Sequence, residues 1–556
     1  ELKSVKIANT VTEIGQAAFE GCTKLENINI PSGVKKIASH TFANCSSLKS
    51  ITIPDSVTTI GNEAFLNCTS LTEVNIPASV TYMDFAPFGG CTSLKAITVD
   101  PENAEFFEKD GVLFGKHRLY DNHDEYEIVL YQYPAGRVDT NYTVPDDVDI
   151  IYYMAFISCA NVVNINIGAK VYSIGDYAFY GCKKLAKITV DEANTHFLVK
   201  DNVLYSCSQV VDEDGTLIRL EIARIERCLP SYEGAYTIPD GVEKVSCAAF
   251  ADCTKLTAVT FPASLTHIWY RAFENCSALT EITIPKNVLV VADEVFKNCV
   301  NLEKAVLEDG VGQIGNSAFA GCEKLASVSL PSTITEIDYR TFEGCKALTE
   351  IYIPDRVNQI EYSAFEGCEK LASISLPPNL TVIHDRTFGD CKSLTEIAIP
   401  NGVTEIGVAA FEGCTDLTEL TIPENLKYIG GAAFGGCSSL TEIRIPGSVG
   451  EMGPSVFVDC TNLKSATIEN GVESISAYMF SGCKKLENFT LPSTIKKIGQ
   501  GAFSGCTTLT DVVIPDGVTY IEYATFADCS SLKNITIPKF EALTKDISNA
   551  LEEKER

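Results

Sequence analysis

The chain has 556 residues and a formal net charge of −29, from 73 acidic and 44 basic residues. Such a surface repels nucleic acid and anionic lipid, so no nucleic-acid partner is predicted. The sequence contains no uninterrupted run of about 18 apolar residues, so no segment is predicted to insert into a membrane.

A Phe-x-x-Cys motif begins near the N-terminus and occurs nineteen times. The cysteines stand 23 residues apart from Cys22 to Cys91, again between Cys159 and Cys182, and through thirteen successive cysteines from Cys253 to Cys529. A period of this length indicates a solenoid, in which each coil buries its apolar side against its neighbours. The first residues begin in the middle of a repeat, and we expect a signal segment and an anchor to lie outside this sequence.

Each repeat has three parts, which Leu25 to Cys45 illustrates. Leu25-x-x-Ile28-x-Ile30 ends in alternation and predicts a short strand, which the following proline ends. A second short extended piece follows, and Ala-Phe-x-x-Cys predicts a single helical or 3₁₀ turn. We therefore predict an α/β solenoid: a right-handed superhelix of about 19 repeats, each with short parallel strands, over residues 1–538.

Two inserts interrupt the period, at about residues 100–144 and 191–238. Each contains paired apolar runs around a polar turn, which predicts a β-hairpin on the side of the solenoid. The inserts either stiffen the N-terminal third or project as recognition elements. After Pro538, Leu543, Ile547 and Leu551 recur every four residues. Residues 539–556 are thus predicted to form a capping helix, with a frayed tail as the alternative.

Nineteen of the 22 cysteines occupy one column beside core phenylalanine and leucine. Neighbouring cysteines would be close enough to bond, but side chains that point the same way pair poorly, and we expect a column of buried, reduced thiols. Cys207 and Cys228 lie in the second insert, where a bond between them stays open.

The full repeat resembles the BspA-like leucine-rich repeat, of the 23-residue treponemal type, with good copies at Leu394–Cys414 and Leu486–Cys506. The likeness covers about residues 1–538, but the usual buried asparagine of leucine-rich repeats has no steady counterpart here. The resemblance implies a cell-surface or secreted protein of anaerobic bacteria or protozoan parasites, similar to adhesins.

Candidate binding residues are those that depart from a polar column. The exposed position between the two isoleucines is mostly Thr, Asn or Ser, but Tyr352 and Arg444 replace them. Because tyrosine and arginine often anchor interfaces, these two are candidate contacts on the concave face. Trp269 and Tyr270 form either a contact site or a covered turn. Glu396, Glu419 and Glu442 share one phase on adjacent coils and either splay into water or share a cation.

No nucleophile elbow, phosphate loop or zinc-protease motif is present in the sequence. The sequence therefore predicts a non-catalytic protein with no cofactor and no metal. We expect an extracellular or cell-surface monomer that binds protein or glycan on host or neighbouring cells. A structural spacer that holds another domain away from the cell wall is the alternative.

Overall fold

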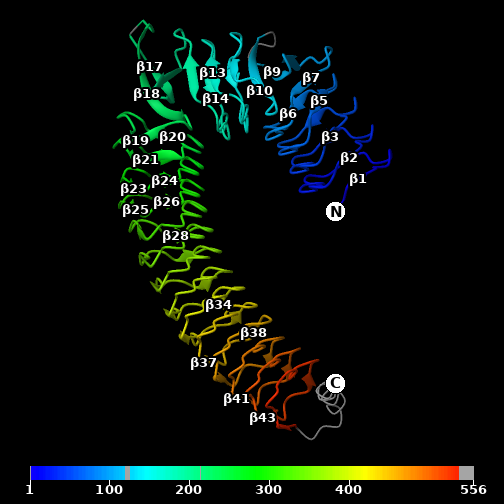
Figure 1. The fold of residues 1–556 in the computed structure, drawn as a ribbon, viewed down its shortest axis with the longest axis vertical. Coiled ribbons are helices and arrows are strands. Elements are labelled where there is room, and N and C mark those ends of the chain that lie inside the picture. Colours follow the sequence, from blue (N-terminus) through cyan, green and yellow to red (C-terminus); the bar gives the residue numbers. More distant parts are fainter. Residues whose placement is uncertain (1, 119–124, 213, 538–556) are drawn as a thin grey trace. The chain divides into compact units, whose positions relative to one another are not determined.

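The computed structural model describes residues 2–118, 125–212 and 214–537, so the predicted capping helix lies outside the described residues. The chain divides into two compact units. Unit 1 comprises residues 1–257 and 268–276, and unit 2 comprises residues 258–267 and 277–556. Each unit is a stack of coils whose strands pair in parallel with the strands of the next coil (Figure 1).

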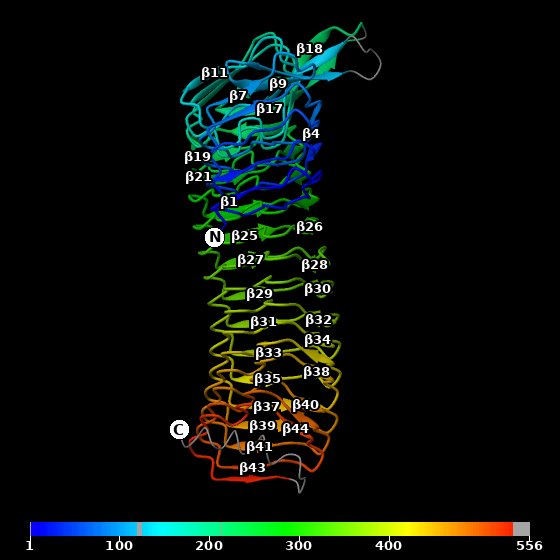
Figure 2. The ribbon, with the colours of Figure 1, turned by 90° about the vertical axis from the view of Figure 1, so that its right-hand side faces the viewer.

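Two columns of strands run through the coils of each unit, and in unit 2 they form two separate series (Figure 2). We call the column at the Leu-x-x-Ile-x-Ile segment the long-strand column, and the column of two-residue strands at the second extended piece of each repeat the short-strand column. The long-strand column in unit 1 consists of β1 (Ser4–Val5), β2 (Asn27–Ile28), β5 (Glu73–Ile76), β7 (Ala96–Val99), β11 (Asn141–Thr143), β13 (Asn164–Ile167), β15 (Lys187–Val190) and β19 (Glu233–Thr237). The short-strand column in unit 1 consists of β3 (Lys36–Ile37), β4 (Thr59–Ile60), β6 (Tyr82–Met83), β12 (Ile150–Ile151), β14 (Ser173–Ile174) and β20 (Lys244–Val245). The residues of β21 (Lys255–Thr260) and β22 (His267–Ile268) are divided between the two units.

Unit 2 repeats the same two columns. Its long-strand column consists of β23 (Glu281–Ile284), β25 (Lys304–Leu307), β27 (Ser327–Ser329), β29 (Glu350–Tyr352), β31 (Ser373–Ser375), β33 (Glu396–Ala398), β35 (Glu419–Thr421), β37 (Glu442–Ile445), β39 (Ser465–Ile468), β41 (Asn488–Thr490), β43 (Asp511–Val513) and β45 (Asn534–Thr536). Its short-strand column consists of β24 (Val290–Val291), β26 (Gln313–Ile314), β28 (Glu336–Ile337), β30 (Gln359–Ile360), β32 (Val382–Ile383), β34 (Glu405–Ile406), β36 (Tyr428–Ile429), β38 (Glu451–Met452), β40 (Ser474–Ile475), β42 (Lys497–Ile498) and β44 (Tyr520–Ile521).

The register of the strands follows the period of the sequence. In the long-strand column Ile165 lies opposite Ile188, and in the short-strand column Ile37 lies opposite Ile60. Partners are therefore equivalent residues of successive repeats. Because strand side chains alternate between two faces, this register keeps every isoleucine of a column in the core.

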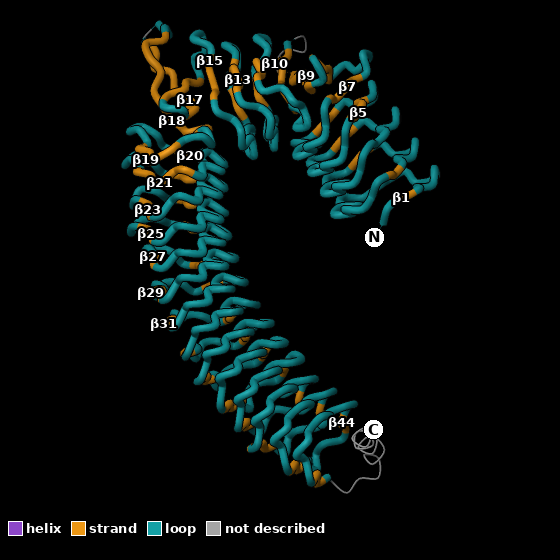
Figure 3. Tube along the Cα trace, in the orientation of Figure 1, coloured by secondary structure: helices purple, strands orange, loops and turns teal. Residues whose placement is uncertain are grey.

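The predicted helical or 3₁₀ turn at Ala-Phe-x-x-Cys is wrong, since the described residues contain no helix (Figure 3). In the turn before Cys45, Ala43 N–H donates to His40 O and Cys45 N–H to Phe42 O, at 3.0 and 3.2 Å. The alternate N–H groups of His40, Phe42 and Asn44 donate instead to the next coil, at 2.7 to 2.9 Å. Moreover, His40 and Asn44 have positive φ, at 55° and 61°. A right-handed helix has negative φ at every residue and bonds its N–H groups within the same segment. The positive φ values and the bonds to the next coil therefore both prevent a helix here.

The predicted count of about 19 repeats is also wrong, because the solenoid has about 23 turns. The inserts supply coils that lack the Phe-x-x-Cys motif. Tyr133 stands 23 residues before Phe156, its ring stacks on that of Phe156 with centroids 5.2 Å apart, and its N–H donates to Ala155 O at 2.8 Å. The first insert thus returns into the stack as a degenerate repeat.

The strands of the inserts are β8 (Phe106–Lys109), β9 (Val112–Arg118), β10 (Tyr126–Gln132), β16 (Phe197–Lys200), β17 (Val203–Val211) and β18 (Leu217–Cys228). In each insert three strands pair antiparallel, and the last one pairs in parallel with the short-strand column, β10 with β12 and β18 with β20. The inserts are therefore continuous with the sheets of unit 1.

The core is built from the repeated columns. In unit 2 the phenylalanine rings from Phe296 to Phe526 stack in sequence, with neighbouring centroids 5.3 to 5.7 Å apart. Beside them the cysteines are buried, and each thiol from Cys322 to Cys529 donates to the carbonyl of the phenylalanine one coil earlier, as Cys414 does to Phe388 at 3.2 Å. Burial raises the pKa of the Cys460 thiol to about 12, which keeps it protonated and unreactive.

Candidate recognition surfaces

The long strands present one side chain in two to solvent. In β37, Glu442 and Arg444 are exposed whereas Ile443 and Ile445 are buried. Exposed polar side chains of neighbouring coils bond to one another in unit 1, where Asn166 Nδ2 donates to Thr143 Oγ1 at 3.0 Å. The exposed face of the long strands is thus mostly polar, so an apolar or charged side chain on it is an exception.

Tyr352 is the last residue of β29 and one of the most exposed large side chains, with 68 % of its surface accessible. Its register partner in β31 is Ser375, which is small and also exposed. An aromatic ring beside a small polar side chain leaves room for a partner to pack against the ring. The geometry is compatible with Tyr352 as a contact residue.

Arg444 is bound on both sides by carboxylates of its own chain. Its Nη1 lies 2.6 Å from Glu424 Oε1 and its Nη2 lies 2.5 Å from Glu469 Oε1. Hydrogen bonds to Glu424 and then to Glu469 raise the pKa of Arg444. A partner would have to displace both carboxylates, so the guanidinium is better placed to join coils than to bind a ligand.

Glu396 and Glu419 lie directly opposite each other in β33 and β35, and Glu442 opens the strand of the next coil. All three side chains are exposed. Among the described residues, no group of three or more His, Cys, Asp or Glu side chains has the arrangement of a metal site. Water can solvate these carboxylates separately, which favours a solvated edge over a shared cation.

Trp269 and Tyr270 follow β22 in the turn of unit 1, not on the long-strand face. Their rings are nearly parallel, with centroids 6.4 Å apart and an angle of 13° between the planes. Tyr270 is 44 % exposed, and Trp269 is partly buried. The backbone holds both in the coil stack, since Trp269 N–H donates to Val245 O and Tyr270 O accepts from Ala248 N–H.

Unit 2 contains an exposed aromatic group that the sequence analysis did not single out. Tyr339, Tyr362 and His384 come from three successive coils and stack one upon another. The two tyrosine centroids are 5.3 Å apart with ring planes at 3°, and Tyr362 and His384 are 4.6 Å apart at 25°. Tyr339 is 47 % exposed and Tyr362 is 37 % exposed. We call these three residues the aromatic stack.

Carboxylates surround the aromatic stack. Asp338 precedes Tyr339, and burial, followed by the charges of Glu336, Asp293 and Glu361, raises the pKa of Asp338 to about 6. Glu361 Oε2 lies 4.0 Å from His384 Nε2. The negative charges are close enough to oppose one another, so the surface favours a cationic neighbour.

The sequence could have revealed part of this stack. Tyr339 and Tyr362 stand six residues before Cys345 and Cys368, so they share one phase of successive repeats. His384 stands seven residues before Cys391, one place out of phase, so the repeat alone does not predict that its ring stacks on Tyr362.

In comparisons with known proteins, the chain matches the family described as "BspA type Leucine rich repeat region (6 copies)" over residues 1–110, 139–212, 234–349, 340–464 and 451–552. No curated protein matches. Similar solved structures include a leucine-rich repeat protein from Bacteroides ovatus, at 26 % identity and a TM-score of 0.39, over 77 % of this chain and 87 % of that one.

Two further structures are similar over most of their length. A leucine rich cell surface protein from Faecalibacterium prausnitzii shows 29 % identity and a TM-score of 0.31, over 71 % of this chain and 78 % of that one. The pneumococcal vaccine antigen PcpA shows 20 % identity and a TM-score of 0.27, over 77 % and 84 %. The described residues of the present chain contain no helix with the length and apolarity that a bilayer crossing requires.

Proposed function

Because the chain belongs to the BspA-type leucine-rich repeat family, we propose that it is a non-catalytic recognition module of a cell surface that binds a protein partner through the aromatic stack of unit 2. The location outside the cell is part of this proposal and rests on the family resemblance. Solenoids offer extended surfaces of this kind because their coils hold side chains at fixed, repeated positions.

The observation that carries the proposal is the exposure of Tyr339 and Tyr362 in a fixed arrangement. Each ring is held by its neighbour, so little side-chain freedom remains to be lost on binding. Exposed aromatic side chains that are already ordered are typical of interface hot spots. A partner that covers them gains apolar contact at a small entropic cost.

The orientation of the rings favours a protein over a glycan. Sugars pack against the faces of aromatic rings, but both faces of Tyr362 are covered, by Tyr339 and His384, and one face of Tyr339 is covered by Tyr362. The ring edges and hydroxyl groups remain for a partner, and side chains of a protein can contact these. The carboxylates of Asp338 and Glu361 beside the stack favour a partner with basic groups at this point.

The test compares the wild-type chain with a Tyr339→Ala/Tyr362→Ala double variant on an array of purified extracellular proteins and glycans. Tyr523→Ala is the matched control, since Tyr523 is 63 % exposed and also stands six residues before its cysteine. We expect binding to at least one protein, weakened about 30-fold or more in the double variant and unchanged in the control.

Other outcomes discriminate between functions. Equal binding by the double variant would reject the aromatic stack and direct attention to Tyr352 or to Trp269 and Tyr270. Binding to glycans alone would reject the protein partner. A chain that binds nothing on the array would contradict the recognition function and favour a structural spacer.

A further inference from the structure

The coil that the second insert contributes to unit 1 has an incomplete turn. In the next coil, Pro262 after the long strand stands 17 positions after Val245 of the short strand. In the insert coil, the equivalent Pro239 stands only 14 positions after Ile225, the register partner of Val245. The turns before Cys182 and Cys253 therefore face each other across a gap.

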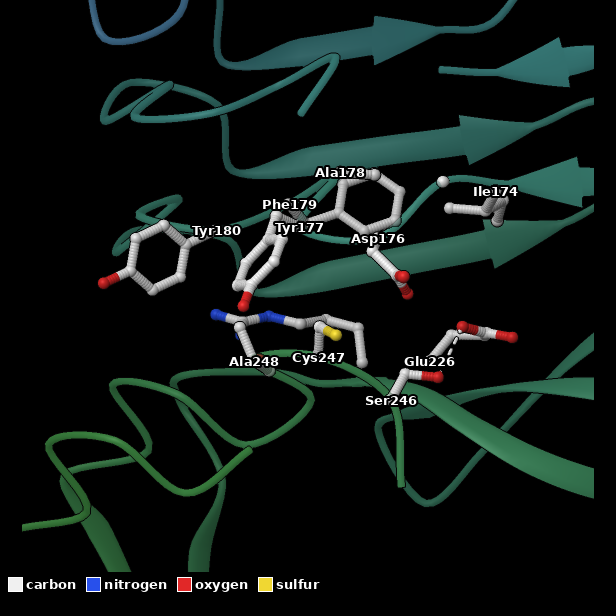
Figure 4. A pocket seen from close by; sticks show the side chains of 12 residues that line it. Ile174, Asp176, Tyr177, Ala178, Phe179, Tyr180, Glu226, Ser246, Cys247 and Ala248 are labelled. Carbon is white, nitrogen blue, oxygen red and sulfur yellow. Dashed lines mark hydrogen bonds between the residues drawn. The ribbon is translucent and has the colours of Figure 1, made fainter. Parts of the chain in front are cut away.

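A small cavity lies in this gap (Figure 4). One wall is the turn that carries Asp176, Tyr177 and Tyr180, and the opposite wall is the turn that carries Cys247 and Ala248. The cavity volume is ≈ 10 Å³, close to the smallest that holds one water-sized particle. The cavity is therefore too small for a sugar, a nucleotide or a tetrahedral oxyanion.

Arg227 lines the cavity from the shortened coil, and only 2 % of its surface is exposed. Its Nη1 donates to Ala248 O, whereas Nε and Nη2 are buried without a hydrogen-bond partner among the described residues. A guanidinium keeps its charge in proteins, so this side chain cannot lose a proton to relieve its burial. Buried charges and buried donors are nearly always paired.

The neighbouring carboxylate does not supply the missing charge. Glu226 accepts from Arg224 Nε at 2.7 Å and from Ser246 Oγ at 2.9 Å, and the second of these bonds is drawn in Figure 4. Glu226 is thereby committed to Arg224. Asp176 also lines the cavity, but Nε and Nη2 of Arg227 form no hydrogen bond to it or to any other carboxylate among the described residues.

Two neutral groups that hydrogen-bond to each other, the Tyr177 hydroxyl and the Cys247 thiol, share the cavity with Arg227. Tyr177 points across it toward the turn of Cys247 and Ala248 (Figure 4). Burial raises the pKa of the Tyr177 hydroxyl and raises the pKa of the Cys247 thiol to about 12, so both groups keep their protons. A second guanidinium, that of Arg271, lies 5.8 Å from the ring centre of Tyr180, a residue of the cavity wall.

We propose that this cavity is a binding site for one small monovalent anion of the size of chloride, held by Arg227 Nε and Nη2 with the Tyr177 hydroxyl as a further donor. The anion supplies the direct partner that Arg227 Nε and Nη2 lack, and it joins the shortened insert coil to the turns on either side. A water molecule of similar size would accept hydrogen bonds but would leave the charge uncompensated.

The test measures thermal unfolding of the full chain while sodium chloride replaces sodium gluconate at constant ionic strength. An ion that binds only the folded state raises the midpoint temperature in a saturable way. We expect this rise in the wild-type chain and in Arg219→Met, which removes an exposed arginine of the same strand, β18. The rise should be absent in Arg227→Met.

Two further measurements keep the proposal testable if Arg227→Met does not fold. Tyr177→Phe removes one donor, so we expect about a tenfold higher chloride concentration at half-saturation. Crystals of the wild-type chain soaked in sodium bromide should show an anomalous peak beside Arg227. Identical unfolding in chloride and gluconate, or a water molecule without anomalous signal at this position, would overturn the proposal.

Discussion

Replacing Phe411 with alanine tests whether the stacked rings carry the stability of unit 2. Phe411 is fully buried and stacks on both Phe388 and Phe434, at centroid distances of 5.3 Å. Removing a buried phenylalanine side chain costs about 3–5 kcal/mol. The loss of two aromatic pairs places this site at the upper end, so we expect a decrease of ~5 kcal/mol in the free energy of unfolding.

Phe526 provides the matched control. It is only partly buried, and in the described part of the chain it stacks on one ring, that of Phe503, at 5.5 Å. Phe526→Ala should therefore cost roughly 2 kcal/mol. Both variants have the same change of side chain, so the difference between them measures the second ring contact and the greater burial.

Guanidinium unfolding followed by two probes provides the assay. Trp269 is the one tryptophan and lies in unit 1, so its fluorescence reports on that unit, whereas circular dichroism reports on all strands. In a solenoid, stability is a sum of coil and interface contributions. Phe411→Ala should therefore add an early transition in circular dichroism and leave the fluorescence midpoint nearly unchanged. Equal shifts of both midpoints, or equal costs at Phe411 and Phe526, would refute the reasoning.

Three further predictions concern single side chains. The pKa of Asp338 is raised from 3.8 to about 6, so between these pH values the folded state binds a proton that the unfolded state has lost, and stability falls as the pH rises. Asp338→Asn should flatten this fall. At pH 7 it should stabilise the chain by roughly 1 kcal/mol, after allowance for the partial exposure of Asp338, as measured by urea unfolding at a series of pH values. Gly344 has a φ of 70° and an added Cβ would lie 3.7 Å from the nearest atom, so Gly344→Ala should cost about 1 kcal/mol from the backbone alone, and Gly344→Asn should cost less in the same assay. Iodoacetamide at pH 8 should label the partly exposed Cys22, Cys207 or Cys247 before the buried Cys414, and peptide mass spectrometry can follow the labelling of each cysteine. Faster labelling of Cys414 would contradict its burial.

The sequence predicted the coil stack because burial forces a residue type to recur at one phase. Ile37 and Ile60, for example, are equivalent in the repeat and are also register partners. The same logic missed the first insert coil, since Tyr133 and Gly136 replace the phenylalanine and cysteine that mark the other coils. Their spacing to Phe156 and Cys159 still carries the period.

The turn was mispredicted because apolar periodicity contains no information about the sign of φ. One signal was present: the residue before each repeat cysteine is Gly, Asn, Asp or Ser, as at Gly344, and the first three types tolerate positive φ best. The residue two places before each phenylalanine gives no such signal. Ala409 and Arg386 both have a φ of 55° there, so the contacts of the stack override local preference.

The sequence could predict a candidate site only where its property, such as exposure, is shared by the equivalent position of every repeat. Tyr352 is exposed as its phase implies. The carboxylates that hold Arg444 come from other phases of the neighbouring coils, at Glu424 and Glu469, and no column of the sequence pairs them with it. Arg227 is harder still, because its burial depends on a turn that the insert shortens.

The position two residues before each phenylalanine has a consequence for how such proteins diversify. The backbone there is set by bonds to the next coil, and the chain places alanine, serine, glutamate, arginine, methionine and tyrosine at it without changing that conformation. Where this residue is exposed, as at Arg340, Arg386 and Tyr478, point mutations can therefore alter the surface of a coil while its core residues stay the same.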